Sequence, residues 1–403
     1  MPEIRFDGFS GEWKERKLSD LMDFSNGINA PKERYGKGRK MISVMDVLDG
    51  SPITYKSIRN SVEVNKEIEN KNRVEKGDLV FVRSSEVVEE VGWTKAYLED
   101  EHALYSGFTI RGKKKKDYDA SFIELNLNSS SRKQIERKAG GSTRYNVSQS
   151  ILNSIVIREP ILEEQIKIGG FFKQLDDTIA IHEQELENLK QTKQGFFQKM
   201  FPKEGESSPE FRFPGFHGDW EQRKLNELVT PIIREIPKPE KPYERISIRS
   251  HAKGTFHQKV DDPKTVAMEK LYVVKENDLI VNITFAWEHA IAVANKEDDG
   301  LLVSHRFPTF LIDKSDINFI RYTVTKESFR RKMELISPGG AGRNRVLNKK
   351  DFINLKVFVP KDIEEQRKIG KLFKQLDETI TLHEQELVTL KQTKKAFLQK
   401  MFV

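Results

Sequence analysis

The stretch EEQIKIGGFFKQLDDTIAIHEQELENLKQTKQGFFQKMF spans residues 163–201, and residues 364–402 read EEQRKIGKLFKQLDETITLHEQELVTLKQTKKAFLQKMF. Of 39 aligned positions, 28 are identical at a constant offset of 201 residues. Self-similarity at one fixed spacing is the signature of a repeated architecture. The chain is therefore one plan of about 200 residues written twice.

Shorter words extend the repeat toward the start of each half. FDGFSGEWKERKLSDL (6–21) returns as FPGFHGDWEQRKLNEL (213–228), and GGSTRYNV (140–147) returns as GGAGRNRV (339–346). The stretches between these matched words share little. A shared frame with a divergent interior indicates one scaffold that recognises two different things.

Both long repeats carry a coiled-coil pattern. Seam residues alternate spacings of four and three without a break from Ile168 to Met200 and from Ile369 to Met401. A 3.5-residue period over more than four heptads predicts two long helices in a coiled coil. The predicted coiled-coil residues are Phe172, Leu175, Ile179, Leu186, Leu189, Phe373, Leu376, Ile380, Leu387 and Leu390.

The linker between the halves favours pairing of the two helices with each other. PKEGESSPE (202–210) is polar, contains two prolines and spans at most about 30 Å. Each helical seam is about 50 Å long, so the second globular unit has to begin near the far end of the first helix. The second helix then returns antiparallel, with the globular units at opposite ends. A parallel homodimeric coiled coil is the rival arrangement.

Short runs rich in β-branched and aromatic residues predict strands in each globular unit. Examples are LVFVR (79–83), FTIR (108–111) and LIVNITF (279–285), with helical stretches at 122–138 and 317–336. The predicted fold class is α+β: two pseudo-repeated β-rich domains joined by two long helices in an antiparallel coiled coil. The expected segments are a first domain at 1–160, a helix at 161–201, a linker at 202–210, a second domain at 211–361 and a helix at 362–403.

Composition narrows the class of protein. The chain has 403 residues and no cysteine, which excludes disulfide scaffolds, zinc ribbons, iron–sulfur clusters and thiol nucleophiles. No run of about 18 apolar residues and no signal-peptide pattern occurs, so we expect a cytoplasmic protein without membrane segments. With 69 Lys and Arg against 62 Asp and Glu, the net charge of +7 suits an anionic partner without identifying one.

Motifs for catalysis or metal binding are missing. The sequence has neither a phosphate-binding G-x-x-x-x-G-K-[ST] nor a G-x-G-x-x-G that opens a helix after a strand. HEQEL occurs twice, but Leu186 and Leu387 stand where a zinc protease has its second histidine. His182 and His383 fall on the helical seam, where a polar residue helps to fix register. We therefore expect no catalytic residue, no metal site and no cofactor in this chain.

Basic and hydrogen-bonding residues gather at strand ends and after Gly-Gly pairs. Arg and Asn match the edges of guanine and adenine, glycine lets the backbone approach a phosphate, and lysine suits phosphates. The candidate DNA-binding residues are Arg83, Ser84, Ser85, Lys113, Lys114, Thr143, Arg144, Tyr145, Arg249, His251, Lys253, Asn282, Thr284, Trp287, Arg343, Asn344 and Arg345.

Structural roles compete with these assignments. The lysines at 113–116 also fit a solvated hairpin tip, and Arg144 and Arg343 also fit ion pairs that tie a helix to a sheet. Trp13 and Trp220 fit core positions better than base-stacking platforms.

Each half ends in the same series of features: G-G-x-x-R, a strand, a proline, EEQ and a long helix. This arrangement resembles the specificity subunit of type I restriction–modification systems. The resemblance covers essentially the full length, and its most specific words are EEQIKIGGFFKQLDDTI, EEQRKIGKLFKQLDETI, FSGEWKERKLSDL and FHGDWEQRKLNEL. It implies that each divergent interior is a target recognition domain for one half of a bipartite, asymmetric site in double-stranded DNA. It also implies an antiparallel spacer that sets the gap between half-sites and helps to bind the methyltransferase subunits.

The resemblance further implies partner subunits that perform the chemistry. Two modification (methyltransferase) subunits would bring S-adenosylmethionine, and restriction subunits would bring ATP- and Mg-dependent translocation and cleavage. The missing methyltransferase and ATPase motifs agree with a non-catalytic subunit that selects sites while others act.

Two other classes of protein remain as alternatives. A single-chain DNA methyltransferase would need a cofactor loop and an Asn/Asp-Pro-Pro-Tyr-like loop, and neither is present. A non-catalytic coiled-coil adaptor with β-rich interaction domains would lack specific, salt-dependent affinity for DNA.

Overall fold

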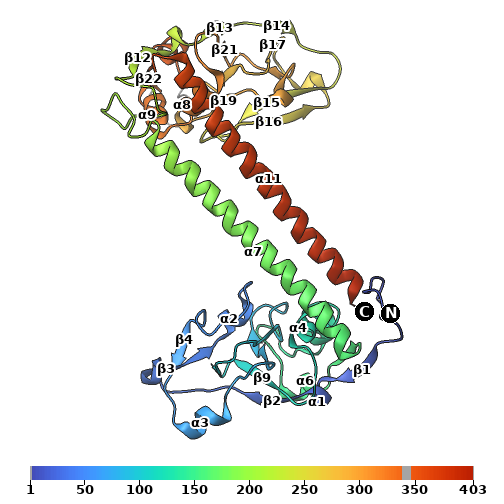
Figure 1. Ribbon diagram of the computed structural model, residues 1–403. Helices are drawn as coiled ribbons and strands as arrows, with labels where there is room; N and C mark the ends of the chain where they lie inside the picture. Colours follow the sequence, from blue (N-terminus) through green and yellow to red (C-terminus); the bar gives the residue numbers. More distant parts are fainter. Residues whose placement is uncertain (1, 338–345, 403) are drawn as a thin grey trace. The chain divides into compact units, whose positions relative to one another are not determined.

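The computed structural model describes residues 2–337 and 346–402. The chain divides into two compact units, which are Met1–Glu183 with Gln385–Val403 (unit 1) and Gln184–Glu384 (unit 2). The long helices are α7 (Leu162–Lys199) and α11 (Ile363–Met401), and each unit contains a part of both (Figure 1). Within the described residues, no helix is long and apolar enough to cross a membrane.

Unit 1 is built on a four-stranded sheet in the order β2-β9-β5-β7 and a three-stranded sheet in the order β4-β3-β8. Two short antiparallel pairs, β1-β11 and β10-β6, complete it. The strands are β1 (Lys14–Lys17), β2 (Met22–Asn26), β3 (Tyr35–Ile42), β4 (Asn60–Val62), β5 (Leu79–Val82), β6 (Ser84–Ser85), β7 (Thr94–Ala96), β8 (Leu104–Tyr105), β9 (Thr109–Lys114), β10 (Tyr145–Asn146) and β11 (Val156–Glu159).

Unit 2 repeats the four-stranded sheet in the order β13-β21-β18-β19 and adds a five-stranded sheet, β14-β17-β20-β15-β16. The pair β12-β22 corresponds to β1-β11 of unit 1. The strands are β12 (Glu221–Lys224), β13 (Thr230–Ile232), β14 (Glu235–Pro237), β15 (Tyr243–Ile248), β16 (Thr255–Val260), β17 (Lys270–Val273), β18 (Leu279–Val281), β19 (Ile291–Val293), β20 (Leu302–Val303), β21 (Thr309–Leu311) and β22 (Lys356–Val359).

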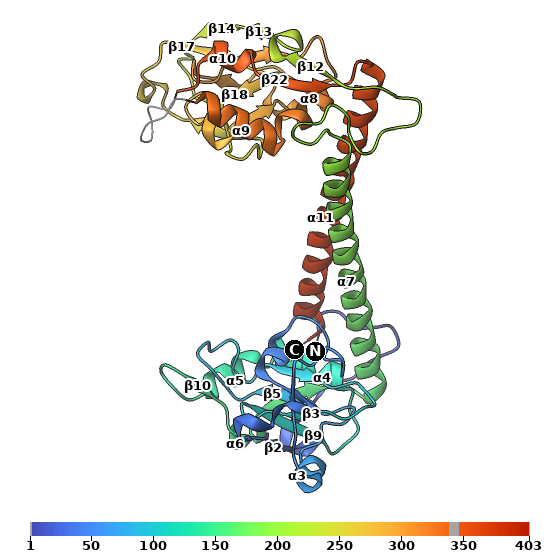
Figure 2. The same ribbon diagram turned by 90° about the vertical axis from the view of Figure 1, so that its left-hand side faces the viewer.

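The helical stretches expected at 122–138 and 317–336 are each broken in two. The first becomes α4 (Ala120–Asn128) and α5 (Arg132–Lys138), because Ser129 leaves helical geometry and its hydroxyl donates to the Leu125 carbonyl. The second becomes α8 (Ile317–Val324) and α9 (Glu327–Ile336), which lie side by side in unit 2 (Figure 2).

Short helices and turns fill the connections. They are α1 (Leu18–Leu21), α2 (Val44–Leu48), α3 (Lys66–Lys71), α6 (Gln149–Asn153), α10 (Lys349–Ile353), η1 (Lys32–Arg34), η2 (Leu225–Glu227), η3 (Pro263–Thr265), η4 (Ala286–Glu288) and η5 (Lys296–Asp298).

The EEQ motif (163–165) holds the start of α7 against the rest of unit 1. Glu164 is 1% exposed, and its carboxylate receives two hydrogen bonds from Arg5, at 2.8 and 2.6 Å. Gln165 donates to the Pro160 carbonyl at 3.0 Å and accepts from the Asp119 backbone N–H at 3.1 Å. A buried charge is tolerated only when it is paired in this way, so the repeated acid and amide are structural.

Unit 2 makes the same contacts around α11. Arg212 pairs with the buried Glu365 at 2.6 Å. Gln366 donates to the Pro360 carbonyl at 3.1 Å and accepts from the Asp316 backbone N–H at 3.2 Å. The duplicated words therefore encode one duplicated junction.

The end of a long helix completes the core of each unit. In unit 1 the Phe402 ring lies 5.3 Å from Phe122 and 6.2 Å from Trp13. In unit 2 the Phe201 ring lies 5.7 Å from Phe319 and 6.0 Å from Trp220. Both tryptophans are buried, as predicted for core positions.

Gly169 in α7 lies against the capping residue of α4. An added Cβ at this position would stand 2.3 Å from Asp119 Oδ1, the atom that accepts from the Phe122 N–H at 2.8 Å. The neighbouring Gly170 has nothing within 4 Å of the same imagined atom. A close approach to Asp119 therefore requires glycine at position 169 but not at position 170.

We therefore expect Gly169→Ala to lower the free energy of unfolding by about 1–2 kcal/mol, because it displaces the α4 cap. Gly170→Ala, the matched control, should raise it by up to about 1 kcal/mol through better helix propensity. Chemical denaturation of the two purified variants measures both effects. Equal stabilities for the two variants would contradict the close approach at Gly169.

Candidate nucleic-acid interface

In unit 1, two predicted groups that are far apart in sequence form one ladder. After β5, Ser84 and Ser85 form β6, which pairs antiparallel with β10, so that Tyr145 faces Ser85. The Val147 N–H donates to the Arg83 carbonyl at 3.0 Å. The strand end and the segment that follows Gly-Gly are thus neighbours.

Gly141 shapes the turn that carries Thr143 and Arg144, both of which are exposed. Its φ is +131°, and a Cβ there would stand 2.0 Å from the Arg144 carbonyl oxygen. Glycine is needed at this position because any side chain would strike the backbone of the turn. The turn presents Arg144 at the surface.

A hollow of about 720 Å³ lies beside this ladder. Ser84, Ser85 and Arg144 line it, together with polar residues that the sequence did not suggest, namely Asn29, Ser43, Asn60, Glu86, Glu90 and Ser106. Exposed apolar side chains stand among them: Met45 is 59%, Phe108 58% and Val87 44% exposed. Such a mixed lining can contact both the polar edges and the methyl groups of bases.

Two predicted residues near the hollow, Arg83 and Ser85, already form hydrogen bonds within the protein. The half-buried Arg83 donates from Nη1 to the Gly107 carbonyl at 3.2 Å. Ser85 donates its hydroxyl to Glu90 and accepts from the Val87 N–H at 3.1 Å. Ser106 Oγ is buried and has no hydrogen-bond partner within the described part of the chain.

Lys113 and Lys114 do not join this group. They lie at the far end of β9, where Lys113 is 4.0 Å from Glu75 and Lys114 is 3.7 Å from Asp117. Lys114 also donates to the Tyr118 carbonyl at 3.1 Å. These lysines line a separate acidic and basic depression at the surface.

Unit 2 places Asn282 and Thr284 after β18, at the corresponding strand end. Asn282 is buried, and its Oδ1 accepts from the Thr284 N–H at 3.1 Å, so it acts within the turn. The Leu347 N–H donates to the Ile283 carbonyl at 2.8 Å, as Val147 does to Arg83 in unit 1. The predicted residues Arg343, Asn344 and Arg345 lie outside the described residues.

The turn with His251 and Lys253 lies against Trp287 and its neighbours in η4. The His251 N–H donates to the Glu288 carbonyl at 2.8 Å, and the side chains of both turn residues are exposed. Arg249 donates to the Thr255 carbonyl and lies 5.3 Å from the centre of the Phe256 ring. The turn therefore brings two of these candidates to the segment of Trp287.

His289, just after Trp287, is a structural histidine. Its Nε2 is 2.6 Å from the Val324 carbonyl, and burial lowers its pKa below the ordinary value. The neutral ring donates to that carbonyl and holds η4 against α8.

Every predicted coiled-coil residue is buried or half-buried. In unit 1 these residues are Phe172, Leu175, Ile179, Leu387 and Leu390, and in unit 2 they are Leu186, Leu189, Phe373, Leu376 and Ile380. Their apolar side chains lie along the two helices where ion pairs join α7 to α11.

Ion pairs between α7 and α11 show how the two helix segments run relative to each other inside each unit. These pairs were not predicted from the sequence. In unit 1 Glu183 pairs with Lys391 at 2.6 Å and Asp176 pairs with Lys394. The residue number rises along α7 while the number of its partner on α11 falls, so the two helix segments are antiparallel. The repeated Asp and Lys at the same offset were the signal that could have revealed these pairs.

Unit 2 repeats this pattern with Lys190 and Glu384, 2.7 Å apart, and with Lys193 and Asp377. Asp377 also accepts from the Tyr322 hydroxyl at 2.6 Å. Burial and this hydrogen bond raise the pKa of Tyr322, so the phenol stays protonated and keeps α8 on the helix.

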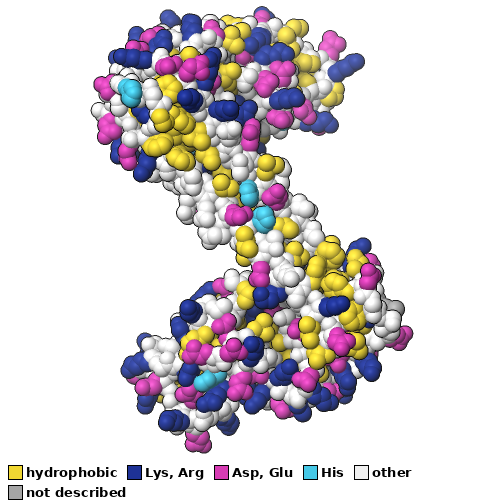
Figure 3. Space-filling view, viewed as in Figure 1, with side chains coloured by type: hydrophobic (Ala, Val, Ile, Leu, Met, Phe, Trp, Pro, Cys, Tyr) yellow, Lys and Arg dark blue, Asp and Glu magenta, His cyan; other side chains and the backbone are white. Residues whose placement is uncertain are grey.

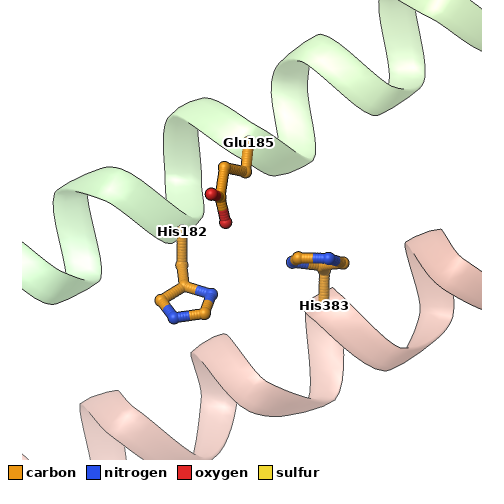
Figure 4. Close-up of side chains that lie close together, drawn as sticks. All are labelled: His182, Glu185 and His383. Atoms are coloured by element: carbon orange, nitrogen blue, oxygen red, sulfur yellow. The ribbon is translucent and has the colours of Figure 1, made fainter.

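The two HEQEL words lie in the middle of the long helices. His182 and Glu185 are one turn apart on α7, and His383 is on α11 (Figure 4). Within unit 1, His182 Nδ1 is 3.9 Å from Glu386 Oε2. The histidine thus has an acidic neighbour on the opposite helix.

Lys and Arg are mixed with Asp and Glu over the face that Figure 3 shows. No broad field of one sign covers either unit on that face, in keeping with a net charge of only +7. Any DNA contact on that face has to rest on particular side chains more than on bulk charge.

Comparisons with known proteins agree on one family. The family model described as the type I restriction modification DNA specificity domain matches the chain twice, over residues 10–191 and 217–392. A putative type I restriction enzyme MjaX specificity subunit from Methanocaldococcus jannaschii is 23% identical over 403 residues, covering 96% of this chain and 92% of that protein. The MjaVIII specificity subunit of the same organism is 23% identical over 279 residues, covering 66% and 65%.

A solved structure shares the fold. The S subunit of a type I restriction–modification system from M. genitalium gives a TM-score of 0.58 at 16% identity, covering 100% of this chain and 99% of that one. The predicted fold class, α+β with two repeated domains and two long helices, is confirmed. The predicted resemblance to specificity subunits is confirmed as well.

Because the family model covers most of both halves, the chain belongs to the type I restriction modification DNA specificity domain family, whose subunits are non-catalytic.

Proposed function

We propose that this chain is the DNA-reading subunit of a type I restriction–modification complex, in which each unit reads one half of a bipartite, asymmetric site. One observation carries the proposal: the same backbone framework presents different side chains in the two units. Where unit 1 has the half-buried Ser85 after its strand, unit 2 has Phe285, which is 41% exposed. Two similar backbone frameworks that carry different side chains are suited to two different half-sites.

The partners follow from this role. Two modification subunits dock on the coiled coil and supply S-adenosylmethionine chemistry, and restriction subunits supply ATP- and Mg-dependent cleavage. The complex works in the cytoplasm, on double-stranded DNA. Modest positive charge is sufficient because base contacts provide specificity while the partners help to enclose the duplex.

Deleting this chain from its host is expected to remove methylation from one bipartite, asymmetric motif. Genome-wide mapping of methylated bases before and after deletion measures this. Restoring the chain on a plasmid is the control and should restore the motif. A methylome that the deletion leaves unchanged would contradict the proposal and favour an adaptor without DNA specificity.

Exchanging residues 1–160 for those of a related subunit should change one half-site and leave the other intact, because the reading surfaces lie within separate units. The reciprocal exchange of residues 211–361 is the matched control and should change the other half-site. Methylome mapping of both chimaeras reads the result. If either exchange alters both half-sites, modular reading is wrong.

Inserting seven residues after Leu186 and seven after Leu387 should widen the unread gap by about 3 base pairs, since a heptad adds about 10.5 Å of helix. These sites keep the pairs Glu183–Lys391 and Lys190–Glu384 in register, because the two pairs flank the insertions, and they separate His182 from Glu386. An insertion in α7 alone, which breaks the register, should abolish methylation. An unchanged gap after the double insertion would show that the helices do not set the spacing.

A further inference from the structure

One backbone position is equivalent in the two units and carries different exposed side chains. In unit 1 the Arg83 N–H donates to the Phe108 carbonyl at 2.9 Å, and in unit 2 the Ile283 N–H donates to the Arg306 carbonyl at 3.0 Å. Phe108 lies one residue before β9, which pairs with β5, and Arg306 lies three residues before β21, which pairs with β18.

Strand register supports the same match. Leu79 faces Gly112 in unit 1, and Leu279 faces Phe310 in unit 2. Counting back four residues from Gly112 and from Phe310 leads to positions 108 and 306. The sheet orders β9-β5-β7 and β21-β18-β19 place both at the same corner of the framework.

The exposed ring of Phe108 contributes little burial energy to the stability of the fold. Its side chain is 58% exposed and lines the hollow with Ser84, Arg144 and Ser106, whose buried Oγ has no hydrogen-bond partner among the described residues. Burial of a phenylalanine is favourable, and in a DNA major groove its natural apolar contact is the thymine methyl group. The surrounding hydroxyl and guanidinium groups suit the polar edges of neighbouring bases.

Arg306 offers different chemistry at the matching position. Its side chain is exposed, and it takes part in no ion pair with another described residue. Its backbone N–H donates to Ser304 Oγ at 3.2 Å, which fixes the turn that carries it. An exposed guanidinium in this setting matches the O6 and N7 acceptors of guanine bidentately.

We propose that the residue at this shared position determines specificity in both units: Phe108 contacts a thymine methyl in one half-site, and Arg306 binds a guanine in the other. This inference rests on the proposed function, since it names the residues through which the two units read DNA.

The test uses the full chain with its modification subunits in the host, and methylome mapping as the readout. Phe108→Ala should relax a single thymine position in one half-site. Arg306→Ala should relax a single guanine position in the other half-site, with methylation of the original sequence falling about 10-fold. Arg306→Lys, which keeps the charge and loses the bidentate geometry, should relax the same position.

Matched controls lie in the same units. Ile68→Ala removes a 40% exposed apolar side chain on α3, and Arg331→Ala removes an exposed arginine on α9. Both should leave every position of the motif unchanged. Thermal melting of all five variants shows whether each is folded, which is expected because every substituted side chain is at the surface.

Two outcomes overturn the inference while leaving the proposed function standing. The first is an unchanged motif in both Phe108→Ala and Arg306→Ala. The second is a uniform loss of methylation with no relaxed position, which would mean contacts to phosphate alone. Failure of the proposed function looks different, because deletion of the whole chain would then leave the methylome unaltered.

Discussion

The closing of each core around the end of a long helix is the interaction on which the rest of the structure depends. Unit 1 packs Phe402 against Trp13, and unit 2 packs Phe201 against Trp220. Without these rings each core would lose a large apolar side chain, at a cost of about 3–5 kcal/mol. The helix end is therefore part of the domain that it touches.

The same junction fixes the start of each helix. Buried Glu164 and Glu365, each held by an arginine, keep the first turn against the sheet domain. The start of each long helix is therefore held to its own unit by buried, paired groups. The side chains that line the hollow of unit 1 are not among these groups, so they can change without loosening the junction.

Much of the fold could be predicted because its signals are local or repeated. A 3.5-residue period and a fixed offset of 201 residues need no knowledge of distant contacts. The breaks at Ser129 and before Glu327 were missed, since a side chain competing for backbone hydrogen bonds is invisible to hydrophobic periodicity. The ladder that joins Ser85 to Tyr145 followed from no local signal, although both residues were among the candidates.

Phe108 shows most clearly why the surface could not be predicted. Its apolar side chain fits the run FTIR (108–111), which was expected to be a strand. The structure begins β9 one residue later, at Thr109, and leaves the ring exposed. The hollow itself draws residues from Asn29 to Arg144, so only the three-dimensional assembly of distant loops creates it.

The place of Met401 and Phe402 in the core of unit 1 has a consequence for the order in which the units fold during synthesis. Residues 1–160 leave the ribosome long before Met401 and Phe402, yet the core of unit 1 includes both of these side chains. Unit 2, by contrast, receives Met200 and Phe201 before its own strands are made. The half that is translated first is thus the half whose core is completed later, by residues 401 and 402.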